Sequence, residues 1–426
     1  MSNGYPNAGF RNTPDTAVVP FYLYAAISFL ACTILLSLST ESFTQHYFSP
    51  QLLAITHGMA LGWGTMIILG ASHQLIPVLT EKSLFSIRLA HLSFFLAAVG
   101  IPLLVYGFYT FNMGWPSKWG GRLVLLAVMA YLVNILYTVN TGKSGNIYSL
   151  FIVTAASWLF ITAFLGLVLV YNFNFPFLPK DVLTYLPLHA HAGILGWFLM
   201  LIIGVASRLI PMFLISKYQN NRRLQLIFLM INGGLIYYLL SYYFQFPYPV
   251  LFSGLMIGTA LSFFLHYIFR VWQSRIRKKV DQPMRISLLS VAIMLLPLFI
   301  LLLVSGYRIT GGQHSRLVLL YGFLIFFGWM TSLILGMTFK TLPFIIWNKH
   351  YHDKAGLMKT PDPKTLMSDR LFMAMGISYL AGFLLFALGI FGGYTSLLKA
   401  GSIVLILAAV FYNLNVLKIW RHKPLV

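Results

Sequence analysis

The sequence predicts an all-α, polytopic membrane protein whose twelve transmembrane helices form three four-helix repeats related by pseudo-threefold symmetry. Composition is the first observation, because 59% of the residues are hydrophobic and only 9% are charged, whereas a soluble domain carries about 25% charged residues. A series of long apolar runs is the second, and an internal sequence repeat is the third. Because an internal repeat sets the architecture of a chain, it is the basis of the expected fold.

Twelve apolar runs are long enough to cross a bilayer, which requires about 20 residues per helix. They cover residues 20–40, 51–79, 89–109, 122–142, 146–172, 185–215, 224–245, 249–272, 286–306, 316–347, 370–391 and 397–420. Polar tails flank them at 1–18 and 421–426, and 19–420 is expected to form a single membrane domain. The expected repeats cover about 19–142, 146–272 and 286–420.

One motif recurs in the second, sixth and tenth runs, at offsets of 134 and 266 residues. The segment 57–79 is identical to 191–213 at 10 of 23 positions and to 323–345 at 7 of 23. The first position of the motif holds His57, His191 and Phe323 in the three copies. Two copies therefore share a histidine that is replaced by an apolar ring in the third.

Basic residues dominate the charge, with 29 Lys and Arg against 8 Asp and Glu and a net charge of +21. Most of them lie in loops on the same side of the membrane as the N-terminus, including the run Arg275–Lys279. The positive-inside rule then predicts that both termini are cytoplasmic, in the inner (cytoplasmic) membrane of the cell. The basic run is expected to anchor this topology beside anionic lipid, not to bind nucleic acid.

Acidic residues are confined to tails, loops and the ends of the apolar runs. Ion-coupled transporters and proton pumps usually carry a carboxylate in the middle of the membrane, so its absence makes both classes less favoured. Paired-carboxylate catalysis is excluded for the same reason. No serine–histidine–aspartate set, glycine-rich phosphate loop or zinc motif is present. Histidine is the remaining candidate for chemistry.

Four histidines are expected near the outer ends of the spans: His57, His189, His191 and His314. Neutral imidazole is the commonest metal ligand among side chains, although an isolated histidine on an apolar helix is usually a hydrogen-bonded core residue. The equivalent places of His57 and His191 in the repeat favour a shared ligand role. These four residues are the candidate metal ligands.

His189 lies two residues before His191, which is about 200° around a regular helix. The two imidazoles are therefore not expected to face one site. Pro187 suits the start of a helix, and the alternative is that His189 lies in a looser first turn. His73, near the cytoplasmic end and on nearly the opposite helix face from His57, is expected to be a packing residue.

Other repeated residues have two interpretations each. The glycines of the motif either permit close helix packing or leave room for a flat macrocycle. The tryptophans Trp63, Trp197 and Trp329 are expected to pack in the core or to contact a cofactor. Polar residues occupy one further set of equivalent positions, at Gln74, Arg208 and Lys340. They either extend to the cytoplasmic surface or form a polar ring at the inner mouth of a threefold pore.

The layout resembles the catalytic subunit of the haem-copper oxidase and nitric oxide reductase superfamily, especially its short, subunit I-like relatives. The resemblance rests on the motifs Thr56–Trp63 and Leu188–Trp197, on twelve spans, and on ligands in the second and sixth. It implies that His57 is an axial haem ligand. It also implies that His191 or His189 takes the place of the copper ligand in the sixth span. In the resulting hypothesis His191 is either the second haem ligand or the ligand of another metal, and Trp63 and Trp197 are the candidate cofactor contacts.

The sequence departs from that superfamily in the tenth span, which has no histidine, and in the seventh, which lacks the histidine pair for copper. A standard haem-copper centre is therefore not expected. The leading hypothesis is a haem-binding protein of electron transfer or of oxygen or nitric oxide handling, with an electron donor or respiratory subunits as partners. If it is an enzyme, it is an oxidoreductase of this type. The alternatives are a cofactor-free transporter on the same scaffold and an assembly or copper-handling partner of an oxidase.

Overall fold

The computed structural model describes residues 13–140, 146–309, 315–355 and 357–424, and within them every long element is a helix. Twelve helical stretches of the described chain are long and apolar enough to cross a membrane, which confirms the predicted polytopic class. They are Asp15–Leu38, Pro50–Thr80, Ile87–Tyr109, Trp115–Asn140, Ile147–Asn174, Val182–Leu214, Asn221–Phe244, Pro249–Gln273, Gln282–Tyr307, Ser315–Lys354, Asp369–Gly392 and Thr395–Trp420.

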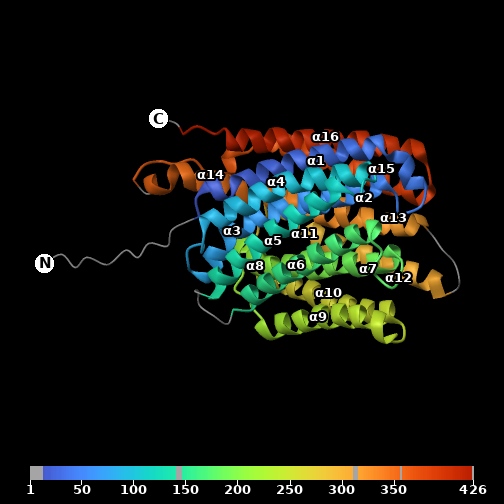
Figure 1. Ribbon diagram of the computed structural model, residues 1–426. Coiled ribbons are helices and arrows are strands. Elements are labelled where there is room, and N and C mark those ends of the chain that lie inside the picture. The colour runs from blue at the N-terminus through green and yellow to red at the C-terminus, as the bar shows by residue number, and fades with distance from the viewer. Residues whose placement is uncertain (1–12, 141–145, 310–314, 356, 425–426) are drawn as a thin grey trace.

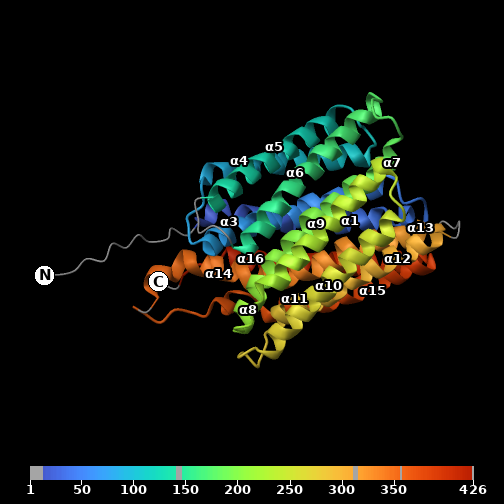
Figure 2. The same ribbon diagram turned by 90° about the horizontal axis from the view of Figure 1, so that it is seen from below.

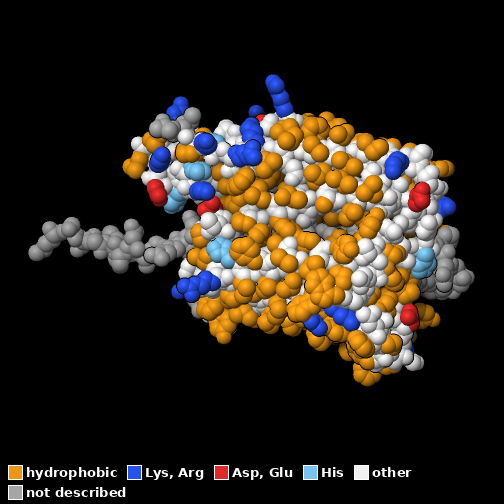
Figure 3. Space-filling model, turned by 45° about the horizontal axis from the view of Figure 1, so that its top comes forward, with side chains coloured by type: hydrophobic (Ala, Val, Ile, Leu, Met, Phe, Trp, Pro, Cys, Tyr) orange, Lys and Arg blue, Asp and Glu red, His pale blue; other side chains and the backbone are white. Residues whose placement is uncertain are grey.

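The helices run nearly parallel and antiparallel to one another along one long axis (Figures 1 and 2). The first, α1 (Val19–Leu38), and the last, α16 (Thr395–Trp420), lie side by side, so the described chain begins and ends at one end of the bundle. We call this the terminal end and the other the far end. At the terminal end, Asp15 forms a 2.7 Å ion pair with Lys349. Apolar side chains cover most of the face shown in Figure 3, as expected for a lipid-facing surface.

The second, sixth and tenth spans form the inside of the bundle. In the most apolar window of each, 67%, 72% and 67% of the residues are buried, against at most 50% in any other span. The outer helices are α4 (Ile87–Tyr109), α5 (Trp115–Asn140), α6 (Ile147–Asn174), α9 (Asn221–Phe244), α10 (Pro249–Gln273), α11 (Gln282–Ile293), α12 (Leu295–Ile309) and α15 (Asp369–Gly392), together with α1 and α16. The repeated motif thus lies in the three spans that contact lipid least.

Each inner span is interrupted by a π-helical segment that begins one residue after the first position of the motif. The second span comprises α2 (Pro50–His57), η3 (Gly58–Thr65) and α3 (Met66–Thr80). The sixth comprises α7 (Val182–His191), η4 (Ala192–Leu199) and α8 (Met200–Leu214). The tenth comprises α13 (Ser315–Phe323), η5 (Leu324–Met330) and α14 (Thr331–Tyr351). Such segments are rare in proteins as a whole, and those that do occur often lie at functional sites.

The repeated glycines lie where an inner span approaches an outer helix most closely. A Cβ atom on Gly62 would lie 2.9 Å from the Ser28 hydroxyl of α1, and one on Gly196 would lie 2.5 Å from Trp158 of α6. One on Gly328 would lie 3.0 Å from Phe383 of α15. These contacts support the packing interpretation of the glycines, because helix faces fill the space that a macrocycle would need.

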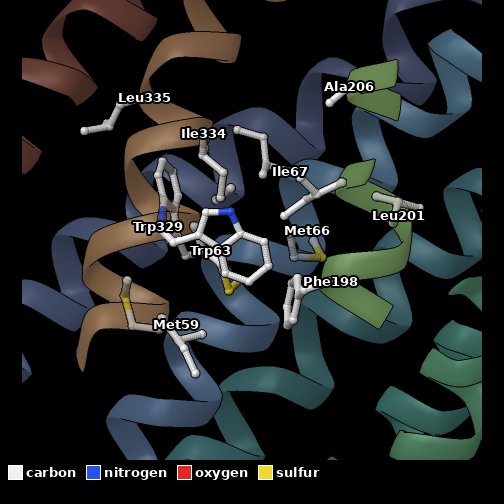
Figure 4. Packing of buried hydrophobic residues seen from close by; sticks show 14 of the residues in the cluster. Met59, Trp63, Met66, Ile67, Phe198, Leu201, Ala206, Trp329, Ile334 and Leu335 are labelled. Atoms are coloured by element: carbon white, nitrogen blue, oxygen red, sulfur yellow. The ribbon is translucent and has the colours of Figure 1, made fainter. Parts of the chain in front are cut away.

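The centre of the bundle is closed by large side chains from all three inner spans (Figure 4). The indole of Trp63 is fully buried among Met59, Met66 and Phe198, and Trp329 approaches from the tenth span. The ring of Trp63 stacks on Phe29 of α1, with the centroids 4.6 Å apart. The far-end and terminal-end halves of the bundle are therefore separated by a packed layer.

Candidate functional site

His57 is the last residue of α2 and is held by its own helix. Ser49 caps the N-terminus of this helix, because its hydroxyl accepts a hydrogen bond from the Leu52 amide. The His57 Nδ1 atom lies 2.8 Å from the carbonyl oxygen of Leu53. Since a carbonyl only accepts, Nδ1 carries the hydrogen, and the lone pair on Nε2 of the neutral ring has no partner within the described part of the chain.

His189 lies in α7, which begins at Val182 after the capping residue Asp181. Pro187 is inside this helix, so the expectation that it marks the helix start is wrong. The early start is stabilised by the Asp181 carboxylate, which accepts the Leu183 amide at 3.1 Å. The His189 Nδ1 atom lies 3.0 Å from the carbonyl oxygen of Thr162 in α6. By the same argument its Nε2 lone pair has no partner among the described residues.

The imidazoles of His57 and His189 lie close together, with ring centroids 6.1 Å apart and planes inclined by 15°. Both line one cavity of about 240 Å³ near the far end of the bundle. Two imidazoles that bind one metal ion have their centroids within about 6.5 Å of each other, given metal–nitrogen bonds of about 2.0–2.1 Å. The observed separation lies within that limit.

Apolar and small side chains form the rest of this cavity wall. Gly166 of α6 lies beside the His189 ring, where a Cβ atom would lie 2.8 Å from Cε1 of His189. Phe108 packs on the His57 ring at a centroid distance of 4.6 Å. Thr162 and Gly166 were not among the candidates predicted from the sequence, although their spacing of four residues places both on one face of a helix.

His191 lies in a different and smaller cavity of about 60 Å³, beside Tyr238 and Tyr321. Its Nδ1 atom lies 2.7 Å from the Pro187 carbonyl oxygen, and its Nε2 atom accepts a long hydrogen bond, 3.4 Å, from the Tyr321 hydroxyl. The prediction that His189 and His191 face different sites is confirmed. His57 is therefore grouped with His189, and not with its equivalent in the repeat.

The third equivalent position, Phe323, packs against Phe386 and Phe383 of α15 and faces neither histidine cavity. His314 lies outside the described residues. His73 is buried between Phe21 and Tyr131, with both ring nitrogens unpaired among the described residues. It is not among the residues that line the His57 cavity.

Of the two tryptophans expected near a cofactor, only Trp197 lines the His57–His189 cavity. Its indole nitrogen donates a 3.1 Å hydrogen bond to the hydroxyl of Thr65, which borders the same cavity. Trp63 instead fills the central layer and donates at 3.0 Å to the hydroxyl of Thr331. Packing accounts for Trp63, whereas Trp197 has both a packing role and a place in the cavity wall.

A larger cavity, of about 730 Å³, lies between α3, α8 and α14 in the terminal-end half of the bundle. Gln74 and Lys340 line it, as expected of residues at the mouth of a central pore. Arg208 does not, because its guanidinium lies over the ring of Tyr148, 6.0 Å from the centroid. The polar set is thus formed by two of the three equivalent residues.

The two imidazole donors of the His57–His189 pair suit a metal ion. Two neutral imidazoles with fixed tautomers suit haem iron or copper. Among the described residues, no group of three or more histidine, cysteine or acidic side chains is arranged to hold a metal ion. The cavity is a little smaller than the roughly 300–1,000 Å³ of typical small-molecule sites. Side chains of the wall therefore have to move to admit a complete haem.

No family model matches the chain. One relative, described as an uncharacterized protein from Aquifex aeolicus (strain VF5), is 26% identical over 345 residues. The match covers 79% of this chain and 80% of that protein. The similarity therefore extends over most of the twelve-helix domain and carries no activity with it.

Proposed function

We propose that this chain is a haem-binding integral membrane protein of electron transfer or diatomic-gas handling, without a standard haem-copper centre. The observation that carries the proposal is the half-buried pair His57 and His189, whose Nδ1 atoms face backbone carbonyls and whose Nε2 atoms have no hydrogen-bond partner among the described residues, beside one cavity. The resemblance to the haem-copper oxidase superfamily supports it through the position of His57. Copper is the second candidate, because imidazole binds it well.

His57 and His189 would hold the metal, and the backbone carbonyls of Leu53 and Thr162 would keep both rings oriented. With both imidazoles bound, a haem would supply reversible one-electron chemistry, and a diatomic gas would bind to the iron only in place of one imidazole. Trp197 and the apolar wall would exclude water from it. An electron donor or respiratory subunit would be the partner, and catalysis, if present, would be an oxidoreduction.

We further propose that the three inner spans and their neighbours are three pseudo-threefold repeats, supported by the matching places of η3, η4 and η5. The terminal end, which carries the Arg275–Lys279 loop, would face the cytoplasm by the positive-inside rule. The histidine cavity would then lie toward the outer face of the inner membrane.

A cofactor-free transporter is the second candidate function, favoured by the 730 Å³ cavity that ends at the central packed layer. A copper-handling partner of an oxidase is the third, favoured by a site in which two imidazoles are the metal donors among the described residues. One experiment separates them: absorption spectra, oxidised and reduced, of the purified protein together with iron and copper analysis. The haem proposal predicts a Soret band and near-stoichiometric iron. Copper without a Soret band would support the third candidate, and neither metal would support the transporter.

A further inference from the structure

The central cavity is apolar at equivalent positions on its three walls. Four layers, taken from α3, α8 and α14 in turn, comprise Ile68, Ile202 and Ile334; Ala71, Val205 and Met337; Leu75, Leu209 and Thr341; and Val78, Met212 and Phe344. Only Thr341 among these twelve is polar, and its hydroxyl is hydrogen-bonded to Tyr22 at 2.9 Å. The walls therefore favour an alkyl chain over a polar solute.

The last layer forms an exposed apolar rim, because the side chains of Val78, Met212 and Phe344 are 49%, 52% and 51% exposed. Charged side chains lie at the same mouth: Arg277, Lys340, Lys364, Asp281 and Asp362. The central cavity is thus apolar inside and carries charged groups at its opening, on the aqueous side.

Positive charge is in excess at this mouth. Lys340 and Asp281 neutralise each other, since Nζ lies 2.6 Å from Oδ2. Asp362 accepts the Lys364 backbone amide at 2.9 Å. The side chains of Arg277 and Lys364 form no ion pair within the described part of the chain, and three cations face two carboxylates.

A buried polar atom lies deeper in the wall. The Gln74 Oε1 atom is buried without a hydrogen-bond partner among the described residues. An unsatisfied buried acceptor is costly, so the cavity gains when a water molecule that donates one hydrogen to Oε1 and the other to an anionic head group reaches this depth. Gln74 and Lys340 occupy equivalent positions, one turn inside the rim.

The floor of the cavity is closed. Met330 lines it, and a Cβ atom on the neighbouring Gly64 would lie 2.7 Å from Met330 Cε and 3.0 Å from Phe198 Cε1. Phe198 lines the His57–His189 cavity on the other side of this contact. A chain entering from the terminal end therefore stops at the central layer.

We propose that the central cavity binds an amphiphile with one anionic head group and a long alkyl chain. The head group lies between Gln74, Arg277 and Lys364, and the chain extends inward between α3, α8 and α14. A long-chain carboxylate and an anionic phospholipid share this chemistry. The proposal does not depend on the His57–His189 site, which lies beyond the packed layer.

Native mass spectrometry of the full protein in a neutral detergent tests it, with oleate, oleyl alcohol and phosphatidylglycerol as probes. We expect one oleate or one phosphatidylglycerol per protein, and at least tenfold weaker binding of oleyl alcohol. Binding of both anionic probes at one competing site identifies the shared chemistry, and preference for one of them identifies its source.

Variants localise the bound probe. Arg277→Gln with Lys364→Gln removes the unpaired charge and should weaken binding of the anionic probe at least tenfold. Ala71→Phe and Val205→Phe fill the chamber from two walls, and each should abolish binding while the protein remains monodisperse. Arg88→Gln, on an exposed residue outside the cavity lining, is the control. The proposal would be overturned if oleyl alcohol bound as tightly as oleate, or if all of these variants bound the anionic probe as tightly as the unaltered protein. Spectra of the same samples keep this result separate from the haem test.

Discussion

The indole nitrogen of Trp63 donates a 3.0 Å hydrogen bond to the hydroxyl of Thr331, which joins the second span to the tenth. Trp197 of the sixth span makes the equivalent bond, at 3.1 Å, to Thr65 of the second. The residue equivalent to Thr65 and Thr331 in the sixth span is Leu199, which has no hydroxyl for Trp329. Two indole–hydroxyl bonds therefore join the inner spans, one between the sixth and the second and one between the second and the tenth. The third bond, which would close a ring between the tenth and the sixth, has no hydroxyl at Leu199 to accept it.

Replacing Thr331 by Val should destabilise the protein by about 1–3 kcal/mol, because the Trp63 N–H would then be buried without an acceptor. Thr259→Val is the matched control, since Thr259 is exposed and, among the described residues, its hydroxyl bonds to the Leu255 carbonyl of its own helix. Unfolding in detergent, followed by fluorescence, measures the difference. Equal stability of the two variants would show that the indole bond contributes nothing.

Gly166→Ala should lower haem or metal content at least severalfold without unfolding the protein. The added methyl group would lie 2.8 Å from Cε1 of His189 and would displace the imidazole from its place opposite His57. Gly322→Ala is the control, because nothing lies within 4 Å of a Cβ atom there. Metal analysis of both purified variants tests this, and full metal content in Gly166→Ala would argue against His189 as a ligand.

Phe323→His should destabilise the protein by about 1–3 kcal/mol, the cost of a polar ring without a hydrogen-bond partner in an apolar cluster. It should bind no additional metal, because Phe323 is enclosed by Phe383, Phe386 and Phe327. Stability and metal content of the variant are the measurements. A gain of metal would mean that the three equivalent positions converge, contrary to the arrangement described above.

A single cysteine introduced at Lys278, in a Cys32→Ala background, should be protected from membrane-impermeant maleimide in intact cells. The terminal end would then be cytoplasmic, as the positive-inside rule predicts. The control is a cysteine at Lys180, in the far-end loop before α7, which should react. The reverse labelling pattern would invert the topology and place the histidine cavity toward the cytoplasm.

Sequence patterns predicted the twelve spans because any helix that crosses the bilayer needs about 20 mostly apolar residues, whether lipid or other helices surround it. They did not predict the π-helical segments after His57, His191 and Phe323, since that geometry depends on how neighbouring helices pack. The spacing of His189 and His191 showed that they face different ways. It could not show which one meets His57, because that depends on the relative rotation of two helices distant in sequence.

The repeat itself favoured a pairing of His57 with His191, and the structure groups His57 with His189 instead. Residues at equivalent positions of a repeat occupy equivalent surroundings, which need not be the same place. His57 packs on Phe108 of α4, His191 on Tyr238 of α9, and Phe323 on Phe386 of α15. Each faces the outer helix that follows its own inner span.

The most direct test of the proposed function compares the metal content and absorption spectra of four variants: His57→Ala, His189→Ala, His191→Ala and His73→Ala. The two imidazoles that share the far-end cavity should each be required, so His57→Ala and His189→Ala should lose most of the bound haem or metal. His191→Ala and His73→Ala should keep it, because their rings face other surroundings. Equal retention in all four variants would contradict the assignment of His57 and His189 as the ligands.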